Sequence, residues 1–311
     1  MCDDVTLPPG WVPIKLLGKG SFGAVFRAER CEDGQRYALK ACKETPESEC
    51  VGLPFDFVRE AAVYARLGGE ARRVPALCEA LVASGCSPTL VLEEVPTNLA
   101  ALLQSLGRHV DRATMRAISL DLTEALAFLH ERGVVHRDVK PQNVLYDRES
   151  GCKLCDFGLA RRLVPGRALT LEVCTLWYRP PEVMLGKADY DGSLDVWSLG
   201  MTLLQVGSGK PKVDEISQYG CLTQIFQMFG TPGPARWSAS TTLPFFDDQF
   251  PKFRGQPRAV ELHLAKHPAA VSFVASMLAL DPAERPSARD LAAHSFVADS
   301  SRSKRARLCQ A

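Results

Sequence analysis

The chain has 311 residues, and its 37 Lys and Arg against 36 Asp and Glu leave a net charge of +1. With 46% hydrophobic and 23% charged residues it matches ordinary globular proteins, which excludes a disordered or fibrous chain. The balanced charge gives no indication of a nucleic-acid-binding or membrane-binding surface, so we expect neither as a partner.

Strand patterns dominate the first hundred residues. Short apolar or alternating runs predict four β-strands, at residues 14–17, 24–26, 36–40 and 90–92. Asp33-Gly34 predicts the hairpin turn between the second and third strands, because this dipeptide favours tight turns. Apolar side chains then recur at helical spacing over residues 54–67, which predicts a helix there.

Helical patterns dominate the rest of the chain. Residues 113–132 carry an amphipathic stripe, and residues 195–206 are nearly all apolar, which predicts a buried helix. Three further helical segments are predicted, at residues 222–229, 269–278 and 288–296. The fold class is therefore α+β, with a small β-rich unit (11–95) followed by a larger α-helical unit (96–297).

Two segments flank these units. Residues 1–10 form an N-terminal extension without the apolar run of a signal peptide, and residues 298–311 form a basic tail that we expect to be disordered. The Lys304-Arg-Ala-Arg307 run in this tail fits either a solvated segment or a nuclear-import signal.

Eleven cysteines are scattered along the chain without a regular framework, and no run of 18 apolar residues is present. Both features indicate a reduced protein of the cytoplasm, the nucleus or both. Cys152 and Cys155 have the spacing of a redox pair or of half a zinc site. Without a second pair or a flanking histidine, we interpret them as part of a strand that carries two small apolar residues.

The first string with chemical content is the glycine cluster Gly18-Lys-Gly20-Ser-Phe-Gly23. Glycines at this spacing let the backbone turn tightly and approach phosphate oxygens, although a plain glycine-rich hairpin would look the same. The strand continues after the cluster, whereas a dinucleotide-binding fingerprint requires a helix there. A Walker loop is excluded as well, because no Gly-Lys-Ser/Thr opens a helix.

Lys40 closes the third predicted strand, 17 residues after Gly23. A lysine at a strand end is usually a solvated charge. Here the strand returns from the glycine hairpin, so we expect the Lys40 ammonium beneath the glycine loop, where it could hold phosphate oxygens. Glu60 lies on the following helix and could pair with it.

The strongest signal is the loop His136-Arg-Asp138-Val-Lys140-Pro-Gln-Asn143, which stands between apolar runs. So many charged and hydrogen-bonding groups in eight residues are unlike a solvated turn. Asp156-Phe-Gly158 follows the next apolar run. A carboxylate and an amide from neighbouring loops supply the oxygen ligands that Mg²⁺ prefers, while phosphates and water take its other positions.

Taken together and in this order, these strings resemble the eukaryotic protein kinases over residues 11–297. The resemblance implies a bilobal kinase fold that transfers the γ-phosphate of ATP, with Mg²⁺, to a protein hydroxyl. The loop residues that it assigns to the ATP phosphates are Gly18, Gly20, Ser21 and Gly23. The residues that it places around adenine are Leu17, Val25, Ala38 and Leu145, with backbone groups of Glu93 and Val95 at the ring edge.

The same resemblance implies the roles of the charged residues. Lys40, paired with Glu60, would hold the α- and β-phosphates. Asp138 would accept or orient the proton of the substrate hydroxyl, and Lys140 would lie close to the γ-phosphate. Asn143 and Asp156 would hold Mg²⁺. Two further residues have structural roles: Glu182 would pair with Arg285, and Asp195 would support the loop around Asp138.

Within the kinases the chain is similar to the cyclin-dependent branch. Residues 54–60 occupy its cyclin-binding helix, and residues 170–179 match the end of its activation loop. This similarity implies a cyclin-type activating partner and an upstream kinase that phosphorylates Thr170. The cations that would receive that phosphate are Arg59, Arg137 and Arg161. Residues 173–179 resemble the segment that selects proline directly after the target Ser or Thr.

Several departures from that branch keep alternatives open. Phe22 stands where many members carry an inhibitory tyrosine, and Phe55 and Phe57 alter the cyclin-binding helix. A mitogen-activated kinase fits less well, because Glu172 stands where that branch has tyrosine. A pseudokinase scaffold is the alternative from another class, although such proteins lose catalytic residues that this chain retains.

Overall fold

The computed structural model describes residues 5–20, 23–43, 52–68, 73–107, 110–164, 170 and 174–298. The chain forms two compact units. The first comprises the residues up to Pro96 together with Cys155–Ala160, and the second comprises Thr97–Leu154 together with the residues from Arg161 onward. The first unit ends at Pro96, one residue beyond the boundary expected after residue 95. The assignment of Cys155–Ala160 to the first unit was not expected.

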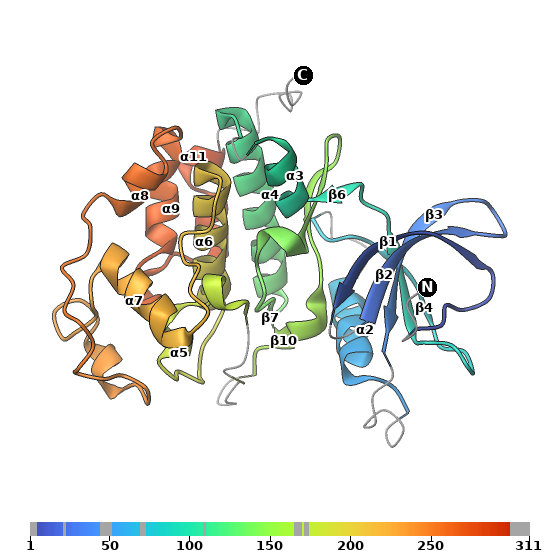
Figure 1. The fold of residues 1–311 in the computed structure, drawn as a ribbon, viewed down its shortest axis with the longest axis horizontal. Coiled ribbons are helices and arrows are strands. Elements are labelled where there is room, and N and C mark those ends of the chain that lie inside the picture. Colours follow the sequence, from blue (N-terminus) through green and yellow to red (C-terminus); the bar gives the residue numbers. More distant parts are fainter. Residues whose placement is uncertain are drawn as a thin grey trace. The chain divides into compact units, whose positions relative to one another are not determined.

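The first unit is built on a five-stranded antiparallel sheet (Figure 1). Its strands, in spatial order, are β1 (Trp11–Gly20), β2 (Gly23–Arg30), β3 (Arg36–Cys42), β5 (Thr89–Glu93) and β4 (Leu77–Leu81). The four predicted strands are all present and are longer than their apolar runs. The sequence analysis missed β4, because its side chains alternate between half-buried and exposed and include Cys78 and Glu79.

The two faces of this sheet carry different residues. Ala28, Leu39 and Val91 are fully buried and form an apolar cluster on one face. Val25 pairs directly with Lys40 across β2 and β3. Because side chains alternate along a strand, Val25 and Lys40 lie on the face opposite the apolar cluster.

One helix, α2 (Phe55–Leu67), completes the described part of the first unit. It begins after Pro54 and ends at Gly68, whose φ of 65° suits glycine. Its buried side includes Phe57, Tyr64 and Leu67, and also the carboxylate of Glu60, which is 1% exposed. A charged group buried to this extent requires a partner.

The second unit packs helices around α4 (Arg112–Glu131) and α6 (Ser193–Ser208), which contact each other. Asp111 caps α4 by accepting a hydrogen bond from the Thr114 N–H at 2.7 Å. The shorter helices are α3 (Leu99–Ser105), α5 (Pro181–Met184), α7 (Gln218–Phe229), α8 (Ala259–His263), α9 (Val271–Met277), α10 (Ala288–Ala292) and α11 (Ser295–Ala298). Among the described helices, none is both long and apolar enough to cross a membrane.

Two of these helices differ from expectation. The single helix predicted over residues 288–296 is wrong: α10 and α11 are separate, and the break lies at Ala293 and His294. The buried residues are Ala288 and Leu291 in α10 and Val297 in α11, so the helical spacing holds within α10 and does not continue into α11. The seven-residue α3 was missed because so short an apolar run shows no clear period.

Small strands complete the second unit. β6 (Thr97–Asn98), β8 (Val144–Asp147) and β9 (Gly151–Leu154) form one sheet, and β7 (Val134–Val135) pairs with β10 (Arg161–Arg162). Cys152 lies buried within β9, and Cys155 follows its end. No group of three or more His, Cys, Asp or Glu residues in the described part of the chain could hold a metal ion.

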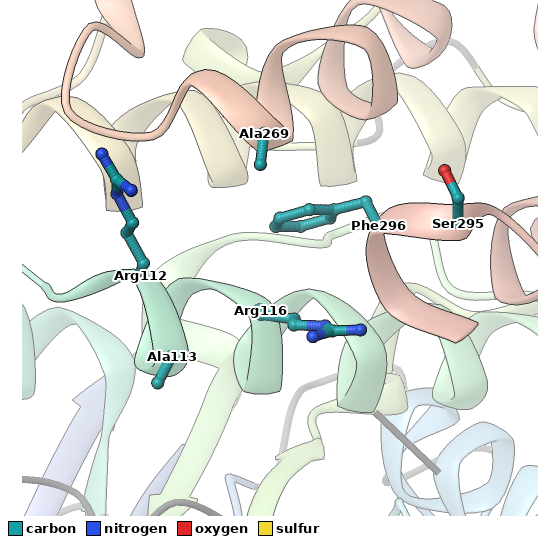
Figure 2. Close-up of a pocket in the computed structure, with 6 residues that line it drawn as sticks. All are labelled: Arg112, Ala113, Arg116, Ala269, Ser295 and Phe296. Carbon is teal, nitrogen blue, oxygen red and sulfur yellow. The ribbon is translucent and has the colours of Figure 1, made fainter. Parts of the chain in front are cut away.

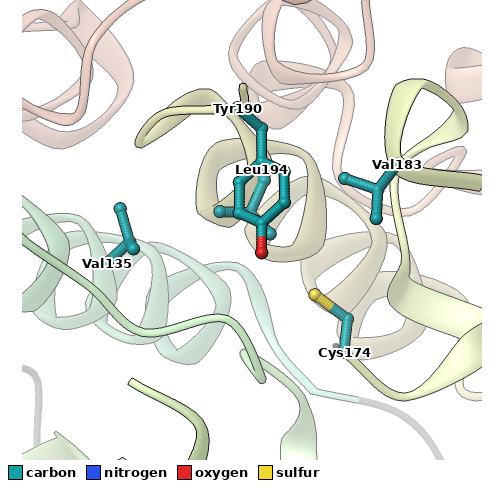
Figure 3. Packing of buried hydrophobic residues seen from close by; sticks show 5 residues of the cluster. All are labelled: Val135, Cys174, Val183, Tyr190 and Leu194. Atoms are coloured by element: carbon teal, nitrogen blue, oxygen red, sulfur yellow. The ribbon is translucent and has the colours of Figure 1, made fainter. Parts of the chain in front are cut away.

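A buried apolar cluster in the second unit includes Cys174. Figure 3 shows Cys174 facing Tyr190 and Leu194, with Val135 and Val183 on either side. All five are less than 9% exposed. Because Cys174 is held by α6 and its neighbours, the next residue, Thr175, has a fixed position.

Candidate active site

The glycine cluster divides into one glycine that the fold requires and two that it does not. Gly23 has a φ of 151°, and a Cβ there would lie 2.1 Å from the carbonyl oxygen of Ala41. Gly18 and Gly20 have negative φ, and a Cβ on either would meet no heavy atom within 4 Å. Packing therefore explains Gly23 alone. Ser21 and Phe22 lie outside the described residues.

Lys40 joins two carboxylates within the first unit. Its Nζ lies 2.6 Å from Glu60 Oε2 and 2.7 Å from Asp156 Oδ1. The expected pair with Glu60 is therefore present. The strand continues two residues past Lys40, to Cys42, so the ammonium is held at the side of a strand and not at its end.

Burial alone would lower the pKa of Lys40, but the negative charges of Glu60 and Asp156 outweigh it and raise that pKa. The ammonium therefore stays protonated at neutral pH. The Asp156 side chain remains 40% exposed despite this contact. Asp156 has a φ of 69°, which is unusual for a residue other than glycine, and its neighbour Phe157 packs edge-on against Tyr64 at 5.2 Å. This ring contact and the Lys40 ion pair attach Cys155–Ala160 to the first unit.

Asp138 is the centre of a hydrogen-bonded group in the second unit. Its Oδ2 accepts from Asn143 Nδ2 at 2.8 Å and lies 2.7 Å from Lys140 Nζ. The same amide also donates to the Asp138 carbonyl at 2.9 Å. Residues 141–143 form one turn of 3₁₀-helix, which returns Asn143 toward Asp138. The carboxylate is 7% exposed and has one fixed orientation.

The other oxygen of Asp138 contacts Thr175, a residue to which the sequence analysis assigned no role. Asp138 Oδ1 accepts from both the backbone N–H and the hydroxyl of Thr175, each at 3.0 Å. Lys140 Nζ in turn donates to Thr175 Oγ1 at 2.6 Å. Thr175 thus positions both the carboxylate and the ammonium. The nearest signal in the sequence was its place in the string 170–179.

We expect Thr175→Ala to lower the rate of the reaction at Asp138 by about 10- to 100-fold, because small misplacements of a catalytic group have effects of that size. Thr175→Ser keeps the hydroxyl and should restore most of the rate. Steady-state kinetics should place the loss in kcat, with KM for the nucleotide little changed. Equal losses for the alanine and serine variants would show that the hydroxyl is not the group that matters.

Asp195 holds the backbone of the loop around Asp138 by hydrogen bonds, as expected. Its Oδ1 accepts from the Arg137 N–H and its Oδ2 from the His136 N–H, both at 2.8 Å. His130 Nε2 lies 2.9 Å from Oδ2. Arg137 has a φ of 67°, a strained conformation for an arginine. The two hydrogen bonds to Asp195 stabilise that conformation.

Burial would raise the pKa of Asp195, but the hydrogen bonds and charges of His130 and His136 outweigh it and lower that pKa below its ordinary value of 3.8. A depressed folded-state pKa stabilises the fold above the unfolded value, and this contribution is lost as pH falls through the folded value. We therefore expect Asp195→Asn to lower the unfolding free energy at pH 7, with a gap to wild type that narrows in acid. Urea titrations from pH 7 to pH 3 measure this gap, and a constant gap would contradict the expectation.

The expected phosphate-receiving residues are distributed over both units. In the second unit, Arg137 Nη1 donates to the exposed Thr170 hydroxyl at 3.2 Å and to the Tyr190 hydroxyl at 2.8 Å, while Arg161 lies in β10. In the first unit, Arg59 contacts Asp56 Oδ1 at 2.9 Å and the carbonyl of Gly158. Arg137, one of the three expected cations, contacts Thr170.

The residues expected around adenine also belong to both units. Leu17, Val25 and Ala38 lie in β1, β2 and β3, none of them fully buried. Glu93 ends β5, and its N–H bonds the carbonyl of Ala76, so a nucleotide contact by its backbone would use its carbonyl. Val95 follows two residues later, and Leu145 lies in β8 of the second unit.

A model of the protein kinase domain family matches residues 11–297. The chain belongs to the protein kinase family. It is 35% identical over 289 residues to "Cell division control protein 2 homolog 3" of Trypanosoma brucei brucei, a match that covers 92% of this chain and 91% of the relative. It is 34% identical over 299 residues to "CTD kinase subunit alpha" of Schizosaccharomyces pombe, a match that covers 94% of this chain and 49% of that relative, about half its length.

Among solved structures, the fold of this kinase is similar to a chain in the structure of the CAK complex from Chaetomium thermophilum bound to ATP-γ-S. The TM-score is 0.83 and the sequence identity is 30%, and the match covers 92% of this chain and 90% of the other. These neighbours place the kinase with the cyclin-dependent-kinase-like members of the family. The expected fold, a β-sheet N-lobe and a helical C-lobe, is confirmed.

The donor groups of this kinase fit the ATP and Mg²⁺ that the family uses. Asp156 presents a carboxylate that is 40% exposed, next to a buried ammonium suited to phosphate. Asn143 directs its amide nitrogen to Asp138, so the amide oxygen is the atom that could serve as a ligand. Oxygen donors of this kind suit Mg²⁺.

Proposed function

We propose that this kinase transfers the γ-phosphate of ATP to serine or threonine in protein substrates. The observation that carries the proposal is the arrangement of Asp138, whose two oxygens are held by Asn143, Lys140 and Thr175. A carboxylate fixed in this way can orient a hydroxyl and take its proton. The retained set of charged residues opposes a pseudokinase, and Glu172, which stands where a mitogen-activated kinase has tyrosine, opposes that alternative.

In the proposed reaction the substrate hydroxyl donates a hydrogen bond to Asp138 and attacks the γ-phosphorus in line. The bond to the ADP oxygen breaks, and the hydroxyl proton passes to the carboxylate. Lys140 neutralises charge on the transferred group, and Lys40 holds the α- and β-phosphates. When bound to Asp156 and Asn143, Mg²⁺ supplies charge neutralisation of the phosphate oxygens.

The kinase is further proposed to require a cyclin-type partner and phosphorylation of Thr170. The Thr170 hydroxyl is exposed and lies 3.2 Å from Arg137 Nη1. A phosphate there adds close to two negative charges beside that guanidinium and creates charge-assisted hydrogen bonds. Glu60 lies on α2, the proposed partner-binding helix, so a partner that holds α2 also holds the Lys40–Glu60 pair.

The test measures transfer of γ-phosphate to a Ser-Pro peptide, with Asp156→Asn as the matched control. With the chain phosphorylated at Thr170 and bound to its cyclin-type partner, we expect activity in the wild type and none in the variant. Equal activity in both would identify a contaminant and refute the proposal. A Ser-Ala peptide tests the proline requirement, and a Tyr-Pro peptide tests the Ser/Thr restriction.

The partner requirement has its own test. We expect the purified single chain, unphosphorylated at Thr170, to be nearly inactive, and Thr170→Ala to abolish stimulation by an activating kinase. Full activity of the unphosphorylated single chain would refute this part of the proposal while leaving the kinase activity established.

Alanine substitutions at Gly18 and Gly23 should differ in their effects on nucleotide binding and on stability. Gly23→Ala should destabilise the fold by more than about 1 kcal/mol, because its φ and the Ala41 carbonyl exclude a side chain. Gly18→Ala should change stability by no more than about 0.5 kcal/mol, since open space surrounds it, yet weaken ATP binding. Thermal unfolding and a fluorescent-nucleotide titration measure both. A loss of stability in Gly18→Ala would contradict the assignment of Gly18 to nucleotide binding.

Localisation is proposed as cytoplasmic, nuclear or both, from the cysteine content and the basic run at residues 304–307. That run lies outside the described residues. Deletion of residues 299–311 should lower the nuclear fraction of the protein in cells. An unchanged distribution would leave the run as a solvated segment.

A further inference from the structure

A cavity lies in the second, helical unit, and none of the residues of the candidate active site lines it. It has a volume of about 440 Å³ and is lined by Arg112, Ala113 and Arg116 of α4, by Ala269 just before α9, and by Ser295 and Phe296 of α11. Figure 2 shows the Phe296 ring between Ala269 and Arg116, with the side chain of Arg112 to one side of them. The volume is within the range of small-ligand pockets.

Two of the residues that line this cavity are arginines. Arg112 and Arg116 lie one turn apart on α4, and none of the six lining residues is acidic. The cavity adjoins the start of α4, a 20-residue helix whose N-terminus carries partial positive charge. The adjacent Asp111, which caps Thr114 through its Oδ1, offsets part of this positive charge, but the two arginines outnumber it. The electrostatics therefore favour an anionic ligand, and two guanidinium groups suit carboxylates.

The cavity also offers a fixed apolar surface. The Phe296 ring packs against Phe273 at 5.2 Å between centroids, and the Phe296 N–H bonds His294 Nδ1 at 3.1 Å. These contacts hold the ring in one position, so an apolar ligand group could lie on it without ordering it first. A ligand that combines carboxylates with an apolar side chain matches both halves of the site.

We propose that this cavity binds an acidic peptide segment of a partner protein, whose carboxylates pair with Arg112 and Arg116 and whose apolar side chain lies against Phe296. The chain's own tail, residues 298–311, does not suit this cavity, because the tail is positively charged like the two arginines. It follows α11 directly and carries Arg302, Lys304, Arg305 and Arg307 against the single acid Asp299. By the same charge, the tail adds to the attraction for an acidic partner.

The test uses fluorescence polarisation with the full chain and a labelled peptide, Glu-Glu-Phe-Glu-Glu. We expect it to bind more weakly at 200 mM than at 50 mM salt, and a Lys-Lys-Phe-Lys-Lys peptide not to bind. The double variant Arg112→Ala, Arg116→Ala should weaken binding at least tenfold, and Phe296→Ala by a smaller factor. Arg289→Ala, which removes an exposed arginine of α10 outside the cavity, should have no effect.

Three results would overturn the proposal. The first is unchanged binding in the double arginine variant when thermal unfolding shows that it is folded. The second is loss of binding on deletion of residues 299–311 without loss in the double variant, which would assign binding to the tail. The third is displacement of the peptide by inorganic phosphate as effectively as by unlabelled peptide, which would indicate a site for simple anions. Kinase activity on a Ser-Pro peptide should be the same in all these variants.

Discussion

Asp138→Asn is expected to lower kcat by about 10²–10⁴-fold, the usual contribution of a general base. The variant keeps the size of the side chain, and its remaining oxygen can accept either the hydrogen bonds from Thr175 or those from Lys140 and Asn143, which contact different oxygens of Asp138. It loses the charge that attracts the hydroxyl proton. Nucleotide affinity should change little, because the phosphates are assigned to other groups. Transfer to a Ser-Pro peptide and a fluorescent-nucleotide titration measure the two quantities.

The matched control is Asp248→Asn, which neutralises an exposed aspartate of the same unit. It should keep full activity, and both variants should unfold at the wild-type temperature. Retention of more than about a tenth of the wild-type kcat by Asp138→Asn would contradict the role of base, since general-base catalysis contributes at least about 10²-fold. A large rise in KM for ATP with unchanged kcat would instead assign Asp138 to nucleotide binding.

The sequence predicted those parts of the site that lie close together along the chain. Asp138, Lys140 and Asn143 fall within six residues, and their mutual contacts are local. The Lys40–Glu60 pair spans 20 residues but follows from a strand and the helix after it. The Lys40–Glu60 contact was predicted from residue types and spacing, whereas Asp138, Lys140 and Asn143 were singled out as one loop without a prediction of their contacts.

Other contacts depend on how distant segments pack, which no local pattern contains. Thr175 contacts Asp138 across 37 residues, because the buried cluster around Cys174 places it there. The assignment of Cys155–Ala160 to the first unit depends on the ring contact between Phe157 and Tyr64, which belongs to α2. Arg137 and Asp156 have positive φ, which residue type alone would not predict, since glycine is the usual occupant of that region.

The same distinction applies to the elements. The long periodic helices α4 and α6 and the apolar strands were predicted, since burial of one face imposes a period on the sequence. The weakly periodic β4 and the short α3 were not. The break between α10 and α11 was also missed: α10 ends at Ala292, and α11 begins only at Ser295.

Arg285→Ala is expected to lower the unfolding free energy by about 3–5 kcal/mol, the cost of breaking a buried ion pair from one side. Arg285 and Glu182 form a bidentate pair at 2.6 and 2.7 Å, and both side chains are 0% exposed. The guanidinium also lies 4.9 Å from the Trp197 ring centroid and donates to the carbonyls of Ala279 and Ser193. Removal of the arginine leaves a buried carboxylate without its partner. Urea unfolding measures the loss.

Two further variants separate charge from packing at this position. Arg289→Ala removes an exposed arginine four residues away and should change stability by less than about 0.5 kcal/mol. The double variant Glu182→Leu, Arg285→Met replaces the pair by apolar side chains, and it should be more stable than either single variant, because no uncompensated charge remains buried. If the double variant were as unstable as Arg285→Ala, the loss would come from packing and the Trp197 contact, and the ion pair would not be its cause.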